Sequence, residues 1–131
     1  MRTNLEFRSS ALMANPPEDA PQGEATARFL AERLPAHGFE VEKVHAEDWG
    51  WRIQIHYEAF PLWIGCGFYP EYSDGVLCFI EPSRPFLRRW FRKIPTQATT
   101  EKLADALERI VADSGLAQDL RWWSEEENAR G

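Results

Sequence analysis

The adjacent carboxylates Glu47 and Asp48, which precede Trp49, have the clearest catalytic chemistry in this chain. Paired carboxylates act as acid and base when burial separates their pKa values. Adjacent residues of a strand, however, point to opposite faces of a sheet, so these two are badly placed to serve one substrate. We therefore interpret residues 47–51 as an edge loop whose acids cap backbone amides.

Cys66, which lies between Gly65 and Gly67, is the candidate nucleophile. A nucleophilic thiol needs an electropositive, partly exposed setting and a base nearby. The alternation of its segment instead points Cys66 into the apolar layer, opposite Trp51 and Cys78. This position predicts a buried, free thiol that behaves as a small hydrophobic residue.

The histidines and cysteines have the wrong arrangement for a metal site. Zinc ligands recur at matched spacings, whereas His37, His45 and His56 do not cluster with Cys66 or Cys78 along the chain. The sequence also lacks a phosphate-binding loop. It therefore predicts no metal site and no cofactor.

Three successive segments alternate apolar and polar residues with a period of two, which is typical of half-buried strands. Joining them by tight turns places Trp51 opposite Cys66, and Cys66 opposite Cys78, on one continuous apolar face. Trp49 is expected on this same face, two residues before Trp51. The expected strands cover residues 49–57, 60–68 and 76–80.

The opposite face of these strands holds a candidate binding site. Its glycines leave a shallow floor, walled by Trp63 and Phe79, and aromatic walls with a few polar groups are typical of binding sites. Alternatively, another helix or a dimer partner covers this face, and the glycines allow close packing. The candidate binding residues are Arg52, Gln54, His56, Trp63, Gly65, Gly67, Phe79 and Glu81.

A basic segment forms a second candidate interaction site. Its apolar residues Phe86, Trp90 and Ile94 have helical spacing, which favours a short helix over residues 86–94 and leaves a strand over residues 85–94 as the alternative. One interpretation is a solvated cationic helix face, paired with the acidic tail at residues 125–127. If the segment is functional, an acidic protein partner fits better than DNA. The candidate interaction residues are Arg84, Arg88, Arg89, Arg92 and Lys93.

The remaining elements place these sites in one α+β domain over residues 1–131, with frayed ends at 1–4 and 125–131. We expect a two-layer sandwich in which two main helices pack on one face of an antiparallel meander of about four to six strands. Thr99 or Thr100 is expected to cap the second helix. The helices are expected at residues 22–37 and 99–114, a loop at 15–21, and further strands at 5–10, 39–45 and 120–123.

The net charge of −6 makes nucleic acid an improbable main partner, because phosphate binding needs a basic field. No apolar run approaches the roughly 20 residues of a membrane span, and residues 1–15 lack the apolar stretch of a secretion signal. We therefore expect a cytoplasmic protein whose two cysteines are thiols, with no membrane contact.

The segments at residues 47–51 and 62–67, with the closing residues 120–123, resemble a family of uncharacterised small bacterial proteins. The resemblance covers most of the chain and implies a bacterial cytosolic origin, but it implies no activity. The short meander also looks like that of toxin-immunity proteins, which is an analogy of fold alone.

These observations favour a non-enzymatic module that binds another protein through the Trp63 face or through the basic segment. A small-ligand binder or minor enzyme that uses Arg52, His56, Trp63 and Glu81 is the alternative. A structural subunit whose open face forms a homodimer is a third possibility.

Overall fold

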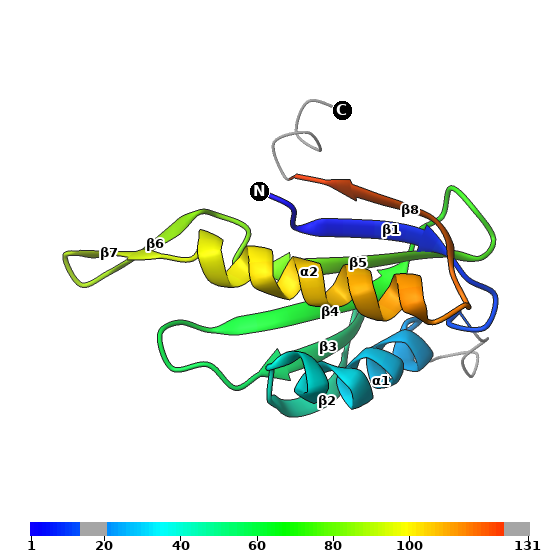
Figure 1. The fold of residues 1–131 in the computed structure, drawn as a ribbon, viewed down its shortest axis with the longest axis horizontal. Coiled ribbons are helices and arrows are strands. Elements are labelled where there is room, and N and C mark those ends of the chain that lie inside the picture. Colours follow the sequence, from blue (N-terminus) through cyan, green and yellow to red (C-terminus); the bar gives the residue numbers. More distant parts are fainter. Residues whose placement is uncertain (14–20, 125–131) are drawn as a thin grey trace.

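The computed structural model describes residues 1–13 and 21–124 and shows an α+β fold with an antiparallel sheet (Figure 1). The six-stranded sheet has the order β2-β3-β4-β5-β1-β8, and β6 and β7 form a separate hairpin. The strands are β1 (Asn4–Arg8), β2 (Val41–Glu47), β3 (Gly50–Ile55), β4 (Leu62–Phe68), β5 (Gly75–Glu81), β6 (Phe86–Arg89), β7 (Arg92–Pro95) and β8 (Gln118–Trp123). The helices are α1 (Glu24–Arg33), a 3-10 helix η1 (Leu34–His37) and α2 (Gln97–Asp113).

The register of the meander is confirmed. Trp51 pairs with Cys66, and Cys66 pairs with Cys78, along one row across β3, β4 and β5. The next row joins Ile53 to Ile64 in the same way. Because successive side chains of a strand alternate between faces, this register sends alternate residues of the three strands into the core. Phe68, at the end of β4, is the exception and is 39% exposed.

The N-terminal strand lies inside the sheet and not at its edge. β1 pairs with β5 on one side and with β8 on the other, so Leu5 lies between Cys78 and Trp122. Both flanking pairings are antiparallel. The predicted first and last strands are therefore confirmed, and β8 is an edge strand.

Helix α1 ends where Pro35 interrupts the α-helical hydrogen bonding, because proline has no backbone N–H to donate. The chain continues as η1 and stops at Gly38, whose φ of 89° is left-handed. Ala27 and Leu30 of α1 are buried, as the helical spacing predicts. Pro35 thus ends the α-helix, and Gly38 ends the 3-10 turn.

Helix α2 begins at Gln97, before the cap expected at Thr99 or Thr100. Thr96 occupies the N-cap position but makes no side-chain capping bond. Its hydroxyl donates instead to the carbonyl of Arg84, while Thr100 Oγ1 donates to the Thr96 carbonyl at 3.0 Å. The predicted cap was wrong because this hydroxyl network, and not the capping preference, fixes the start of the helix.

The helix expected over residues 86–94 was wrong, because this segment forms the β6–β7 hairpin. Leu87 pairs with Ile94, and both are partly buried against the core. Trp90 and Phe91 make the two-residue turn, with Trp90 at a φ of 56°. Apolar residues seven positions apart match a helix, but they also match a cross-strand pair. Tertiary packing of that pair decides in favour of the hairpin.

Both helices lie across the same face of the sheet, and their apolar sides meet the core-facing residues Ile53, Ile64 and Cys66 (Figure 1). The thiols of Cys66 and Cys78 are fully buried there and unbonded, with 3.8 Å between the sulfur atoms. Contact with Cys78, together with burial, raises the pKa of the Cys66 thiol. Neither cysteine has the setting of a nucleophile.

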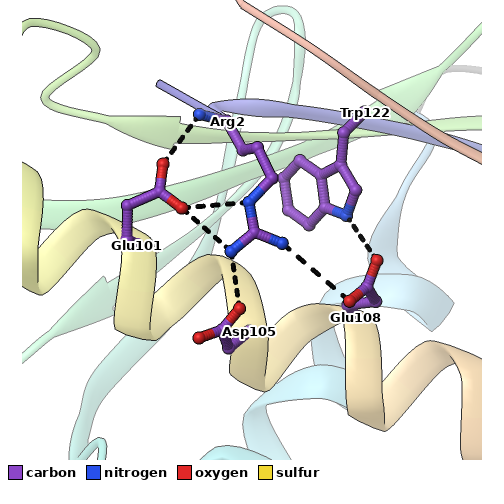
Figure 2. Close-up of polar contacts among 5 residues, drawn as sticks. All are labelled: Arg2, Glu101, Asp105, Glu108 and Trp122. Atoms are coloured by element: carbon purple, nitrogen blue, oxygen red, sulfur yellow. Dashed lines mark hydrogen bonds and ion pairs between the residues drawn. The ribbon is translucent and has the colours of Figure 1, made fainter.

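Arg2 links the start of the chain to α2 (Figure 2). Its guanidinium lies 2.9 Å from Glu101 and also contacts Asp105, and it stacks 5.4 Å from the ring centre of Trp122 in β8. Trp122 Nε1 donates to Glu108 at 3.2 Å, which ties β8 to the same helix. Arg2 thus holds the N-terminal residues, α2 and the edge strand together. No helix in the described ranges is long and apolar enough to cross a membrane.

The buried thiols give a first prediction. We expect native Cys66 and Cys78 to react with a thiol reagent only as fast as the protein opens, because both sulfur atoms are covered and the pKa of Cys66 is raised. Both should react at once in denaturant. Absorbance-monitored labelling measures this, and rapid labelling of one native thiol would contradict the burial.

Glu101 gives a second prediction, which concerns pH. Burial alone would raise its pKa, but hydrogen bonds from the Arg2 amide and guanidinium outweigh it and lower the pKa. The pair therefore stabilises the fold above the unfolded pKa of about 4.3, and the effect disappears as the pH falls through the lower folded pKa. Glu101→Gln should cost less than about 1 kcal/mol of unfolding free energy at pH 7, since the pair is partly exposed. Urea melts should show the difference between the two proteins shrinking as the pH falls below the unfolded pKa.

Candidate functional site

The uncovered face of the sheet carries the candidate binding residues in the expected rows. Arg52 pairs with Gly65, which pairs with Phe79, so these three lie side by side on β3, β4 and β5. In the neighbouring row Trp63 lies between Gln54 and Glu81. The placement of these residues is confirmed, while their role in binding stays a prediction.

The floor expected at Gly65 is filled. The ring of Phe79 lies directly over Gly65, and a Cβ atom there would clash with the ring. Gly67 is covered by the turn before β3, where the carbonyl of Trp49 would lie 3.4 Å from an added Cβ. At Gly65 the missing side chain lets the Phe79 ring approach the sheet closely, whereas at Gly67 an added Cβ would make only ordinary contact with the backbone.

Trp49 belongs to this face and not to the apolar face where alternation placed it. It lies in the turn between β2 and β3, outside both strands, so the period of two does not apply to it. Its ring centre is 5.8 Å from that of Trp63 and 5.2 Å from that of Phe79. Trp63 and Phe79 are 5.6 Å apart in an edge-to-face arrangement. We call these three residues the aromatic cluster.

The aromatic cluster borders a hollow that is open to solvent. The hollow has a volume of about 370 Å³. Trp49 is 46% exposed and Phe68, on its rim, is 39% exposed. Large aromatic side chains thus surround a space that the described residues leave unfilled. The lining consists of Trp49, Trp63, Gly67, Phe68, Leu77 and Phe79.

Arg52 is held over the aromatic cluster by its own neighbours. Its guanidinium carbon lies 4.0 Å from the ring centre of Trp63, within the range of a cation–π interaction. Nε and Nη2 donate to Gln54 Oε1 at 3.1 and 2.7 Å, and Gln54 Nε2 donates to the Leu62 carbonyl at 3.2 Å. The charge is therefore fixed in orientation beside the hollow, an arrangement suited to recognition.

His56 and Glu81 lie at the ends of their strands. His56 follows β3, is exposed, and donates its backbone N–H to the Glu40 carbonyl at 2.8 Å. Glu81 is partly buried and accepts a hydrogen bond from the Ser83 amide at 3.2 Å. Their side chains flank the aromatic cluster and do not line its hollow.

Sequence reasoning missed His45, which shares the uncovered face. His45 pairs with Arg52 across β2 and β3, and its Nε2 lies 3.0 Å from Glu47 Oε1. Its Nδ1 is buried without a hydrogen-bond partner. The i, i+2 spacing of His45 and Glu47 on one strand is the signal that could have found this pair. The Glu47 carboxylate therefore orients the His45 imidazole on this face.

The five interaction candidates of the basic segment lie on or beside the hairpin. All are exposed, and Arg84 precedes β6. Lys93 Nζ lies 4.2 Å from the ring centre of Phe86, and the other four make no ion pair with any described residue. The acidic tail expected to pair with them, at residues 125–127, lies outside the described part of the chain, as does most of the loop expected at 15–21.

A larger groove, of about 850 Å³, lies between η1 and α2. Its lining mixes acidic and basic side chains, and Tyr57 OH shares a 2.8 Å hydrogen bond with Thr99 Oγ1 beside it. Within residues 1–13 and 21–124, no group of histidine, cysteine or carboxylate side chains could hold a metal ion. The aromatic hollow is smaller and is lined mainly by aromatic side chains, and Arg52 is stacked on one of them, Trp63.

Comparisons of the chain with protein-family models, curated proteins and solved structures found no match. The resemblance to a family of small bacterial proteins stays a prediction. Function is therefore inferred from the geometry of the uncovered face.

A pair of neighbouring substitutions tests which face is core. Ile64→Ala should lower the unfolding free energy by about 2–5 kcal/mol, because Ile64 is fully buried. Trp63→Ala should cost less than about 2 kcal/mol, since it loses aromatic contacts at a partly exposed site. Denaturant melts measure both, and equal losses would show that the Trp63 face is also core.

Proposed function

We propose that this protein is a non-enzymatic binding module that recognises another protein through the aromatic cluster and Arg52. The observation that carries the proposal is the solvent-open hollow between Trp49, Trp63 and Phe79. Monomeric proteins seldom expose contiguous apolar surface without a function for it, and tryptophan and arginine are the residues most enriched at binding hot spots.

The shape of the site supports a protein partner. The hollow is shallow enough to be walled by side chains alone, and one apolar or aromatic side chain of a partner would fill it. Arg52 is stacked on Trp63 and is already oriented by Gln54, so its remaining N–H groups can donate to a carboxylate or carbonyl without rearranging. A rim of polar groups around an apolar centre is the usual anatomy of such interfaces.

The proposal includes the expected architecture and compartment. We propose that the domain is a two-layer sandwich in which one face of the sheet packs in the core and the other face binds the partner. The unbonded thiols of Cys66 and Cys78, only 3.8 Å apart, support a reducing compartment such as the cytoplasm.

One observation favours a second candidate, a small-ligand binder or minor enzyme. His45, oriented by Glu47, lies beside Arg52, so an imidazole and a guanidinium share one row of the uncovered face. General acid–base chemistry on an anionic substrate would use such a pair. This candidate replaces His56 and Glu81 of the sequence-based hypothesis with His45 and Glu47.

Affinity capture followed by binding measurement tests the leading proposal. The full chain is used as bait in an extract of a bacterial source, and each captured protein is purified and titrated against it. We expect Trp63→Ala to weaken the complex by about thirtyfold or more, equivalent to at least about 2 kcal/mol, as for an interface hot spot. Trp49→Ala should weaken it as well.

The matched control is Leu116→Ala, which removes an exposed apolar side chain remote from the uncovered face and should leave affinity unchanged. A partner that binds Trp63→Ala and Trp49→Ala with unchanged affinity would contradict the proposal. Concentration-dependent dimerisation that Trp63→Ala abolishes would assign the face to a homodimer. A retained small molecule lost on His45→Ala would favour the second candidate.

A further inference from the structure

The β6–β7 hairpin projects from the body of the domain and presents two aromatic side chains at its tip (Figure 1). Trp90 is 87% exposed and Phe91 is fully exposed, the most exposed of the large apolar residues that the structure describes. Neither contributes to the core. Exposing tryptophan and phenylalanine to water on a protruding turn is energetically unfavourable. Such residues therefore mark a surface that another molecule covers when the protein functions.

Cations surround this aromatic tip on both faces of the hairpin. Arg89 pairs with Arg92 directly behind the turn, and Arg88 pairs with Lys93 in the next row. Because successive rows of an antiparallel pair point to opposite faces, the four charges form a collar and not a one-sided patch. From residue 82 to residue 100 the chain contains no acidic residue, although the whole chain carries a net charge of −6.

The base of the hairpin is fixed to the domain. Leu87 and Ile94 pack against the core, and the Thr96 amide donates to the Pro85 carbonyl at 2.9 Å. The Thr96 hydroxyl also donates to the Arg84 carbonyl at the start of α2. The tip is therefore presented in one orientation and does not depend on a flexible tether.

We propose that the hairpin docks the domain on an anionic lipid bilayer, with Trp90 and Phe91 inserted at the interface and the cationic collar on the lipid phosphates. Tryptophan concentrates at the boundary of bilayer and water, and basic side chains are drawn to anionic headgroups. The acidic remainder of the chain is repelled from the same surface, which orients the hairpin toward it.

The dimensions of the hairpin match those of the bilayer interface. The two cationic rows lie within about 7 Å of the tip, at roughly 3.4 Å per strand residue. The polar region of one leaflet is about 5–7 Å thick, half the difference between total and hydrocarbon thickness. Aromatic side chains at the lower boundary of this region thus place all four cations among the phosphates.

An end-on bilayer contact explains the collar better than a macromolecular partner does. A protein groove or nucleic-acid strand meeting one side of the hairpin would use either Arg88 and Lys93 or Arg89 and Arg92. A planar surface entered by the tip uses both pairs at once. The expectation of no membrane contact rested on the lack of a spanning segment, which does not bear on a surface-bound hairpin. This inference is independent of the aromatic cluster.

Vesicle sedimentation of the full chain tests the inference. We expect binding to vesicles of equal phosphatidylcholine and phosphatidylglycerol but not to phosphatidylcholine alone, and release at high salt because screening shortens the reach of the charges. The double variant Arg89→Glu/Arg92→Glu should lower the partition coefficient by about thirtyfold or more, given roughly 1 kcal/mol per surface-bound cation. Trp90→Ser/Phe91→Ser should lower it at least tenfold.

The matched control is Lys102→Glu/Arg109→Glu, which makes the same charge change on exposed positions of α2 and should retain most of the binding. Circular dichroism verifies that each variant is folded. As a second measurement, brominated acyl chains should quench the fluorescence of the unmodified protein, and Trp90→Phe should remove that quenching.

The inference is overturned if the protein ignores anionic vesicles, or if its binding to them is unchanged by the tip variant. It is also overturned if tip-dependent binding appears only with polyglutamate or duplex DNA, which would assign the hairpin to an acidic macromolecule.

Discussion

The pairing register of β3, β4 and β5 is the constraint on which the rest of this structure depends. With Cys66 between Trp51 and Cys78, the buried aliphatic residues of these strands, such as Ile53, Ile64 and Ile80, face the helices, whereas Leu77 lies on the opposite face. A slip of one residue would bring Trp63 and Arg52 into the core and expose Ile64. Burial of those aliphatic side chains therefore determines which residues lie on the opposite face. It also determines which aromatic and charged residues are neighbours there.

The uncovered face is organised by a second constraint, the absence of a side chain at Gly65. Because Phe79 lies across that position, its ring is brought to within 5.6 Å of Trp63 and 5.2 Å of Trp49. Glycine weakens a strand and leaves no side chain to pack, so its presence in a central strand calls for a compensating contact. Here the contact is an aromatic ring that sits against the backbone, and the same ring lines the hollow.

Much of the sheet could be predicted because alternation and burial agree there, as in the row from Ile53 through Ile64. Trp49 was assigned to the wrong face because it lies in a turn, where side chains do not alternate between the two faces as they do in a strand. The β6–β7 hairpin was misassigned because Leu87 and Ile94 satisfy a helical period and a cross-strand pair equally well. His45 was overlooked because its significance depends on Arg52, a neighbour only in space. Local patterns of apolar and polar residues therefore predicted most of the helices and strands. The contacts between those helices and strands could be learned only from the structure.

The position of β1 has a consequence for biosynthesis. β1 is made first, yet it pairs with β5 and with β8, so that Asn4 lies beside Trp123 near the far end of the chain. At about 5–20 residues per second, a ribosome needs on the order of 10 s to travel from one strand to the other. During that interval β1 has an open edge or no partner at all, and such edges recruit other chains. The edge of β1 is thus exposed to chaperones and to misassembly until β8 has been translated and has left the exit tunnel.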